Sequence, residues 1–174
     1  MDNNFSRRKF LKKGIAAGAI LPLSGIIFQS SGLAQSPPQQ RSDRGPRLTL
    51  EMVEEFVRVA HGNLDRVKEM LEKHPALVNA TWDWGGGDWE TGLGGASHMG
   101  RRDIALYLLD HNARMDVFAA AMLGKLEIVK AAVAAFPGIP KVPGPHGIPL
   151  IAHARKGGDQ ATEVLDFLER LAQS

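Results

Sequence analysis

The feature that most constrains this chain is a helix–glycine–helix pattern that occurs four times between residues 48 and 171. Gly62, Gly100, Gly124 and Gly157 each separate two stretches in which apolar residues recur at spacings of three and four, as in an amphipathic helix. Glycine at such a break is a common helix stop. Because each helix pair is too thin to bury its own apolar face, consecutive pairs are expected to stack. The pattern therefore predicts an all-α solenoid of about four helix-turn-helix units.

The spacing of these glycines and the residues around two of them resemble the ankyrin repeat family. The intervals from Gly62 to Gly100, then to Gly124 and to Gly157, are 38, 24 and 33 residues, and ankyrin repeats have a period of about 33 residues. The segments TGLGGASHMG (91–100) and IPLIAHARKG (148–157) resemble the family's first helix, and IALYLLDHNA (104–113) resembles its second. The resemblance implies a short ankyrin-like repeat domain over residues 48–174, with irregular fingers between the repeats.

The connecting fingers are expected to differ in length. The first interval is longer than the family period, and its extra residues fall in TWDWGGGDW (81–89), which predicts an enlarged finger. The second interval is too short to hold a finger. Residues 136–149, FPGIPKVPGPHGIP, contain five prolines and three glycines, so they cannot form a helix. We expect them to be a rigid replacement for the fourth finger that spaces the last helix pair, with His146 near its tip.

The first 34 residues have the layout of a cleavable export signal. A basic start precedes an apolar stretch over residues 14–28, and small residues follow up to Ala34, after which we expect cleavage. The apolar stretch is short and contains Pro22. We therefore expect no stable membrane span once the signal is removed.

The start of this segment indicates a particular export route. Residues 6–12, SRRKFLK, resemble the twin-arginine signal through Arg7 and Arg8. The alternative is an ordinary secretory signal with a chance arginine pair. Either route predicts a periplasmic protein. Residues 35–47, QSPPQQRSDRGPR, then form a flexible proline-rich tether between the cleavage site and the repeat domain.

Charge and cysteine content exclude several classes of protein. Five of the 21 lysines and arginines, but only one of the 19 acidic residues, fall in the signal, so the remaining chain carries a net charge of about −2. That charge gives no support to nucleic-acid binding. The sequence has no cysteine, which excludes disulfides, thiolate metal sites and cysteine nucleophiles.

All three tryptophans lie in the glycine-rich stretch over residues 82–100, WDWGGGDWETGLGGASHMG. A phosphate-binding P-loop would need lysine after its last glycine, and Leu93 follows Gly92. A dinucleotide-binding pattern would need a third glycine where Ser97 stands, after a buried strand that this stretch does not supply. We therefore exclude both kinds of phosphate site.

Metal binding and catalysis find little support in the sequence pattern. Asp83, Asp88, Glu90 and His98 lie close together, but their spacing matches no calcium-loop signature. We therefore assign no metal ligand, no catalytic residue and no cofactor, and enzymatic activity stays unsupported rather than excluded. Histidines near helix ends commonly cap the helix or compensate its dipole, and His153 is expected to be a partly buried structural residue; the chain's histidines stand at 61, 74, 98, 111, 146 and 153.

A recognition role has more support. Trp82, Trp84 and Trp89 fall within eight positions of one finger, and tryptophan is enriched at binding hot spots. We expect them to anchor a partner, with Asp88 and Glu90 as orienting hydrogen-bond acceptors. The alternative is that the indoles pack against neighbouring repeats. We expect the finger to do both, with at least one indole packed and at least one presented.

The ankyrin resemblance implies a second contact surface. Members of the family bind through finger tips and through the two variable positions before each glycine, on the concave face. The positions carried over in this way are Ala60, His61, His98, Met99, Met122, Leu123, Arg155 and Lys156, of which the last six are the candidate contact residues. Met99, Met122 and Leu123 would form an apolar floor, edged by the two basic residues. The alternative is that the stack closes over Met122 and Leu123 and makes them core.

These observations favour an exported protein–protein interaction module that binds a periplasmic partner through its tryptophan finger and concave face. The partner is unidentified; because the twin-arginine route carries folded proteins, a cofactor-bearing exported enzyme is one option. The alternative function is a periplasmic protein that binds a small molecule or a metal ion in a pocket under the Trp-Gly finger.

Overall fold

The structure, a computed structural model, describes residues 45–173 and is mostly helical in that range, as the sequence predicts. Eight α-helices follow one another in pairs: α1 (Leu50–Val59) with α2 (Leu64–Lys73), α3 (Gly92–His98) with α4 (Arg102–Asp110), α5 (Val117–Met122) with α6 (Leu126–Ala135), and α7 (Leu150–Lys156) with α8 (Thr162–Ala172). Short 3₁₀ turns connect them: η2 (Pro75–Asn79), η3 (Ile139–Lys141), η4 (Pro145–Gly147) and η5 (Gly158–Ala161). A single small sheet, β1 (Thr81–Asp83) with β2 (Trp89–Thr91), completes the described elements.

Local sequence signals set several helix starts. The side chains of Thr49, Asn63, Thr91 and Asp116 accept hydrogen bonds from backbone N–H groups in the first turns of α1, α2, α3 and α5. Such caps satisfy amide donors that the helix itself leaves unpaired. The predicted break at Gly62 and restart after Asn63 are confirmed.

Glycines are required where the turn of one helix pair meets the next. Gly100 and Gly124 have φ values of 72° and 69°, a left-handed conformation that side chains rarely adopt. A Cβ atom on Gly124 would also collide with the carbonyl oxygen of Gln160, and one on Gly157 with that of Met122. The recurring glycines therefore end helices and let adjacent turns touch.

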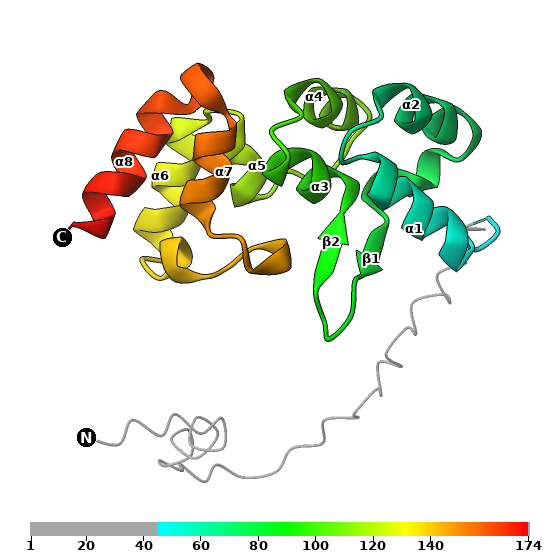
Figure 1. The fold of residues 1–174 in the computed structure, drawn as a ribbon, viewed down its shortest axis with the longest axis horizontal. Coiled ribbons are helices and arrows are strands. Elements are labelled where there is room, and N and C mark those ends of the chain that lie inside the picture. The colour runs from blue at the N-terminus through cyan, green and yellow to red at the C-terminus, as the bar shows by residue number, and fades with distance from the viewer. Residues whose placement is uncertain (1–44, 174) are drawn as a thin grey trace, which may run out of the picture. The chain divides into compact units, whose positions relative to one another are not determined.

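The helix pairs stack in chain order (Figure 1). Helix α3 contacts α1 and α5, and α5 contacts α3 and α7. One core cluster lies under the first pairs around Phe56, Leu93 and Leu108, and a second lies under the last pairs around Val129 and Leu150. Burial of these apolar side chains is the main source of stability for the stack.

The Trp-Gly finger is a β-hairpin that projects beside α1 and α3 (Figure 1). Strands β1 and β2 are antiparallel, with Trp82 opposite Glu90 and Asp83 opposite Trp89. The tip consists of glycines with positive φ, and Oδ1 of Asp83 accepts hydrogen bonds from the backbone of Gly85 and Gly87. Side chains alternate between faces along a strand, so Glu90 turns inward while Trp89 faces solvent.

The predicted export signal over residues 1–34, with Arg7, Arg8 and the cleavage position after Ala34, lies outside the described residues. Most of the predicted tether over 35–47 lies outside them as well. Within residues 45–173 no helix is long and apolar enough to cross a membrane.

Candidate metal centre

Four side chains from distant parts of the chain converge at the base of the hairpin. They are His61 just after α1, Glu90 in β2, His98 at the end of α3, and His146 in η4. Each offers one ligand atom, and these four atoms all lie within 4.8 Å of one another. Imidazole nitrogens and carboxylate oxygens are the usual metal ligands in a protein without cysteine.

Glu90 lies at the centre of the cluster and is 1% exposed. Its Oε2 atom accepts a hydrogen bond of 2.8 Å from Nε1 of Trp84 and lies 3.3 Å from Nε2 of His61 and 3.4 Å from Nε2 of His146. Its Oε1 atom lies 2.9 Å from Nε2 of His98. The pair is not aligned as a hydrogen bond, and buried Oε1 accepts none from the described residues. A buried carboxylate oxygen without such a donor is costly and is free to bind a cation.

His61 is oriented by the helix that precedes it. Its Nδ1 lies 2.9 Å from the carbonyl oxygen of Val57; because a carbonyl only accepts, Nδ1 carries the proton and donates it. Nε2 then faces the cluster, where it lies 3.1 Å from Nε2 of His98. A Cβ atom on Gly95 would come within 2.7 Å of the His61 ring. The glycine in α3 therefore makes room for this imidazole.

His146 is held by Asp88 at the hairpin tip. One Asp88 oxygen accepts a 2.8 Å hydrogen bond from the His146 backbone N–H, and the other lies 2.7 Å from Nδ1. Nδ1 donates to this carboxylate, so Nε2 points to Glu90. The backbone of His146 has a φ of 58°, which is uncommon outside glycine. A carboxylate that fixes the tautomer of a histidine is a recurrent arrangement around metal ions.

The electrostatics of the cluster favour a bound cation. Burial opposes ionisation of Glu90, but its close polar contacts with His61, His98 and Trp84 outweigh burial and hold its pKa below the usual value. The contact with Glu90 raises the pKa of His61, against the opposing effect of burial. A backbone hydrogen bond from His146 lowers the pKa of Asp88. The carboxylate oxygens of Glu90 and the Nε2 atoms of the three histidines thus surround one point. Either protons or a metal ion must offset the negative charge of the carboxylate there.

The distances match the ligand shell of a small ion. A tetrahedral ion with bonds of about 2.0–2.1 Å places its ligand atoms roughly 3.3 Å apart. Four close contacts lie between 2.9 and 3.4 Å: His61 and His146 approach Oε2 of Glu90, His98 approaches Oε1, and His61 approaches His98. The full set of ligand atoms spans up to 4.8 Å, so the side chains must close in by about 1 Å to form one such shell. Three imidazoles and one carboxylate suit divalent first-row transition metals. Calcium and magnesium prefer shells made of oxygen alone.

The structure brings part of the predicted recognition surface into this cluster. Glu90 and His98 supply ligand atoms, Trp84 donates to Glu90, and Asp88 orients His146. Because Glu90 is buried, it is not accessible to a partner protein as an orienting acceptor. Of the tryptophans, Trp84 donates to Glu90 and is 37% exposed, whereas Trp89 is 59% exposed.

The remaining predicted site residues fall outside the cluster. Trp82 is half-buried in β1, and Met99, Arg155 and Lys156 are exposed. Arg155 forms an ion pair with Glu169 of α8. Within the described part of the chain, these side chains form no hydrogen bond, ion pair or ring contact with the four ligand residues.

The prediction that Met122 and Leu123 form an exposed apolar floor is wrong. Both are buried, at 0% and 2% exposure, in the first core cluster. They lie at the end of α5, which is enclosed by α3 on one side and α7 on the other. The stack closes over them, which was the alternative interpretation of these residues.

Sequence reasoning did not select His146, and it named His61 only as one of the variable positions before a glycine, without choosing it as a site residue. His61 makes the backbone contact expected of a helix-end histidine. That contact gave no indication that its Nε2 atom also faces Glu90. His146 lies in the segment expected to act only as a spacer. A usable signal did exist: His61 stands one residue before Gly62 and His98 two residues before Gly100, so the stacking of α1 on α3 places them side by side.

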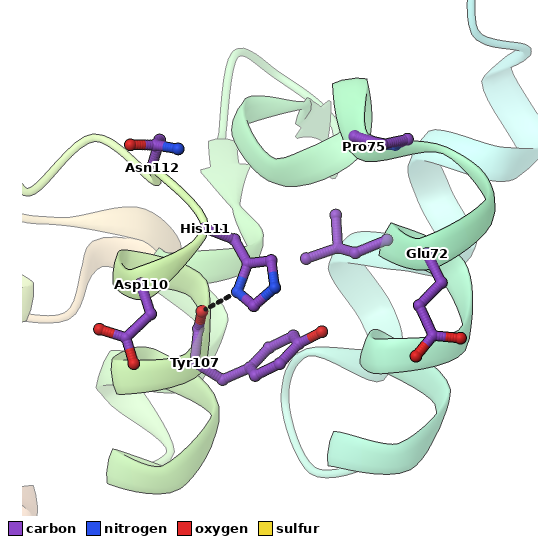
Figure 2. A pocket seen from close by; sticks show the side chains of 7 residues that line it. Glu72, Pro75, Tyr107, Asp110, His111 and Asn112 are labelled. Atoms are coloured by element: carbon purple, nitrogen blue, oxygen red, sulfur yellow. Dashed lines mark hydrogen bonds between the residues drawn. The ribbon is translucent and has the colours of Figure 1, made fainter.

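A separate pocket lies between α2 and α4, lined by Leu71, Glu72, Pro75, Tyr107, Asp110, His111 and Asn112. Figure 2 shows the His111 ring above Tyr107, with its Nδ1 bonded to the Tyr107 carbonyl oxygen, while the carboxylates of Glu72 and Asp110 point away from the ring. The polar groups do not converge on one point. The pocket therefore shows no site comparable with the histidine cluster.

Comparison of the chain with family models, curated proteins and solved structures gives no match, so the chemistry of the cluster is argued from its geometry.

Proposed function

We propose that this protein binds one divalent transition-metal ion through His61, Glu90, His98 and His146. The observation that carries the proposal is the orientation of the ligand atoms. Val57 and Asp88 hold the Nδ1 protons of His61 and His146, so that their Nε2 atoms face the buried carboxylate of Glu90. This assigns the metal-binding function that the sequence left as an alternative, with the site at the base of the Trp-Gly hairpin.

Calorimetric titration of the metal-free protein with Zn²⁺ and Co²⁺ tests the proposal. We expect one ion per chain, no binding of Ca²⁺ or Mg²⁺, and at least tenfold weaker binding in His98→Ala. His111→Ala is the matched control, because His111 lies outside the cluster. Like His61, it contacts the backbone carbonyl oxygen four residues earlier, with its Nδ1 2.8 Å from that of Tyr107. Absence of Zn²⁺ and Co²⁺ binding in wild type, or unchanged binding in a folded His98→Ala protein, would overturn the proposal.

In this proposal, an ankyrin-like stack of helix pairs holds the metal site. Its support is the order of four helix pairs, the glycines at their turns and the contacts of α3 with both neighbouring first helices. The stack supplies His61 and His98 from adjacent pairs. The hairpin and residues 136–149 then supply Glu90 and His146.

Export belongs to the same proposal. Residues 1–34 direct the chain to the periplasm by the twin-arginine route, which carries folded proteins, so the metal ion is inserted before export. Replacing Arg7 and Arg8 with lysine is expected to retain the protein in the cytoplasm. Unchanged amounts in the periplasmic fraction would show that another route is used.

A partner protein that docks on Trp89 is the second candidate function. Its support is that this indole is 59% exposed. It lies on the solvent-facing side of β2, whereas the neighbouring Glu90 points to the buried side. Affinity capture from periplasm is expected to retain a specific partner, such as a cofactor-bearing exported enzyme, with wild type and lose it with Trp89→Ala. Equal capture by both proteins would remove Trp89 from the interface.

A further inference from the structure

The four proposed ligands are exposed to different degrees, and this gives the cluster two sides. The side chain of Glu90 is 0% exposed and that of His98 is 9%, whereas His61 reaches 23% and His146 reaches 32%. Glu90 and His98 form the floor, and His61 and His146 form a rim that solvent reaches. A closed structural metal site surrounds its ion with protein ligands on all sides.

We propose that the metal ion keeps one coordination position open on this rim, beside Trp84, and that the position takes a small anionic ligand from solution, such as a carboxylate. This inference rests on the proposed metal site and goes beyond it, because it makes the ion reactive toward solutes. A purely structural ion would have no such position.

Trp84 borders the open side. Its ring centroid lies 6.1 Å from that of His61 and 5.9 Å from that of His146, the two rim histidines. Its Nε1 donates to Oε2 of Glu90, which leaves Oε1 without a hydrogen bond from the described residues and free for the ion. The indole is itself 37% exposed. A small ligand that enters between the rim histidines therefore passes beside this ring.

Charge explains why the ligand would be an anion. Metal-binding histidines are neutral, so a divalent ion and the Glu90 carboxylate leave one formal positive charge in a partly buried site. The second nearby carboxylate, Asp88, keeps its negative charge while it accepts from the backbone N–H and the Nδ1 of His146, so it offsets part of this charge from outside the ligand shell. An anion that completes the coordination shell would neutralise the remaining charge.

The ligand set also leaves room in the shell. His61, Glu90 and His98 come from the stacked helices and the hairpin, and three protein ligands are the number found in catalytic zinc sites that hold a water molecule. His146 is added by a segment rich in proline and glycine. With all four bound in a tetrahedral shell no position is open, so the open position requires that His146 leave the shell or that the ion become five-coordinate.

The test uses the protein loaded with Co²⁺, whose visible absorption reports coordination number and ligand exchange. Azide and acetate are titrated into the complex at neutral pH. We expect saturable spectral changes that fit one anion per ion. A folded Trp84→Ala variant that still binds Co²⁺ should show altered azide affinity, and Trp89→Ala, which removes an exposed indole from the same hairpin, should match wild type.

The outcomes separate this inference from the metal proposal. If Co²⁺ binds and its spectrum stays constant at high azide and acetate, the site is closed, so the inference fails while metal binding stands. If Co²⁺ does not bind, the metal proposal itself fails. Equal effects of Trp84→Ala and Trp89→Ala on azide affinity would contradict the position assigned beside Trp84.

Discussion

The Nε2 atoms of His61 and His98 lie 3.1 Å apart and both face the carboxylate of Glu90. The Val57 carbonyl holds the proton of His61 on Nδ1, so a neutral His61 directs a lone pair at His98. A proton on Nε2 of His98 can bridge the two nitrogens as a hydrogen bond, and a metal ion bound between them would replace that proton. A proton and a metal ion therefore compete for the same place.

This competition predicts that metal affinity falls in acid. The pKa of His61 is raised above 6.5 by its contact with Glu90, so in the metal-free protein His61 binds its proton at a higher pH than a free histidine does. Metal binding must displace that proton. We expect Zn²⁺ affinity to be constant at alkaline pH and to decline from above pH 6.5 downward. Calorimetric titration at several pH values measures this, and a decline confined to pH below 5 would contradict it.

Removing the metal ion is expected to destabilise the fold. The ligands come from α1, β2, α3 and η4, so an ion that binds only the folded chain links these segments. At free Zn²⁺ about 100 times Kd the gain in unfolding free energy is about 2.7 kcal/mol. Thermal unfolding with Zn²⁺ and with a chelator measures the difference. His98→Ala serves as the control, since the chelator should leave its melting temperature unchanged.

Glu90→Gln is expected to abolish tight metal binding without loss of the helical stack. Glutamine has nearly the same size and its amide oxygen can still accept from Trp84, but it lacks the negative charge that offsets the ion. We expect affinity for Zn²⁺ to fall by about 100-fold or more, beyond the effect of an outer partner. Glu69→Gln removes an exposed carboxylate that pairs with Arg66 and Lys73 and should bind Zn²⁺ like wild type. Wild-type affinity in Glu90→Gln would exclude Glu90 as a ligand.

The helical part of the fold was predictable because its signals are local. Glycine stops, the Asn63 cap and apolar spacing act within a few residues, and they located the helix pairs correctly. The enlarged finger was located by its excess length over residues 81–89. Its pairing as a β-hairpin depends on the contacts between its two strands and was not anticipated.

The cluster was only partly predictable because it depends on contacts between distant segments. Glu90 and His98 were selected only as partner-binding residues, with no metal ligand assigned, and the bond between Asp88 and His146 spans 58 residues and depends on the path of a proline-rich segment. His61 looks like His111 in sequence and makes the same backbone contact. Only the stacking of α1 on α3 distinguishes them, and the same stacking buries Met122 and Leu123.

Asp88→Asn is expected to weaken metal binding through His146 without removing a ligand. The asparagine oxygen can accept one hydrogen bond from His146, but the carboxylate that held both the backbone N–H and Nδ1 is gone. Loss of such an outer partner costs about 10- to 100-fold in metal affinity. Asp83→Asn, which changes the neighbouring carboxylate that caps the hairpin tip, is the control. Equal affinities in both variants would remove Asp88 from the assigned role.

Gly95→Ala separates helix stability from metal binding, because its two effects have opposite signs. Alanine favours a helix over glycine by up to about 1 kcal/mol, yet its Cβ would lie 2.7 Å from the His61 ring and push the imidazole out of the cluster. We expect at least tenfold weaker Zn²⁺ binding with little loss of metal-free stability, since His61 is partly exposed and can rotate. Gly138→Ala, with nothing within 4 Å of the new methyl, should bind normally. Wild-type affinity in Gly95→Ala would show that His61 is not a ligand.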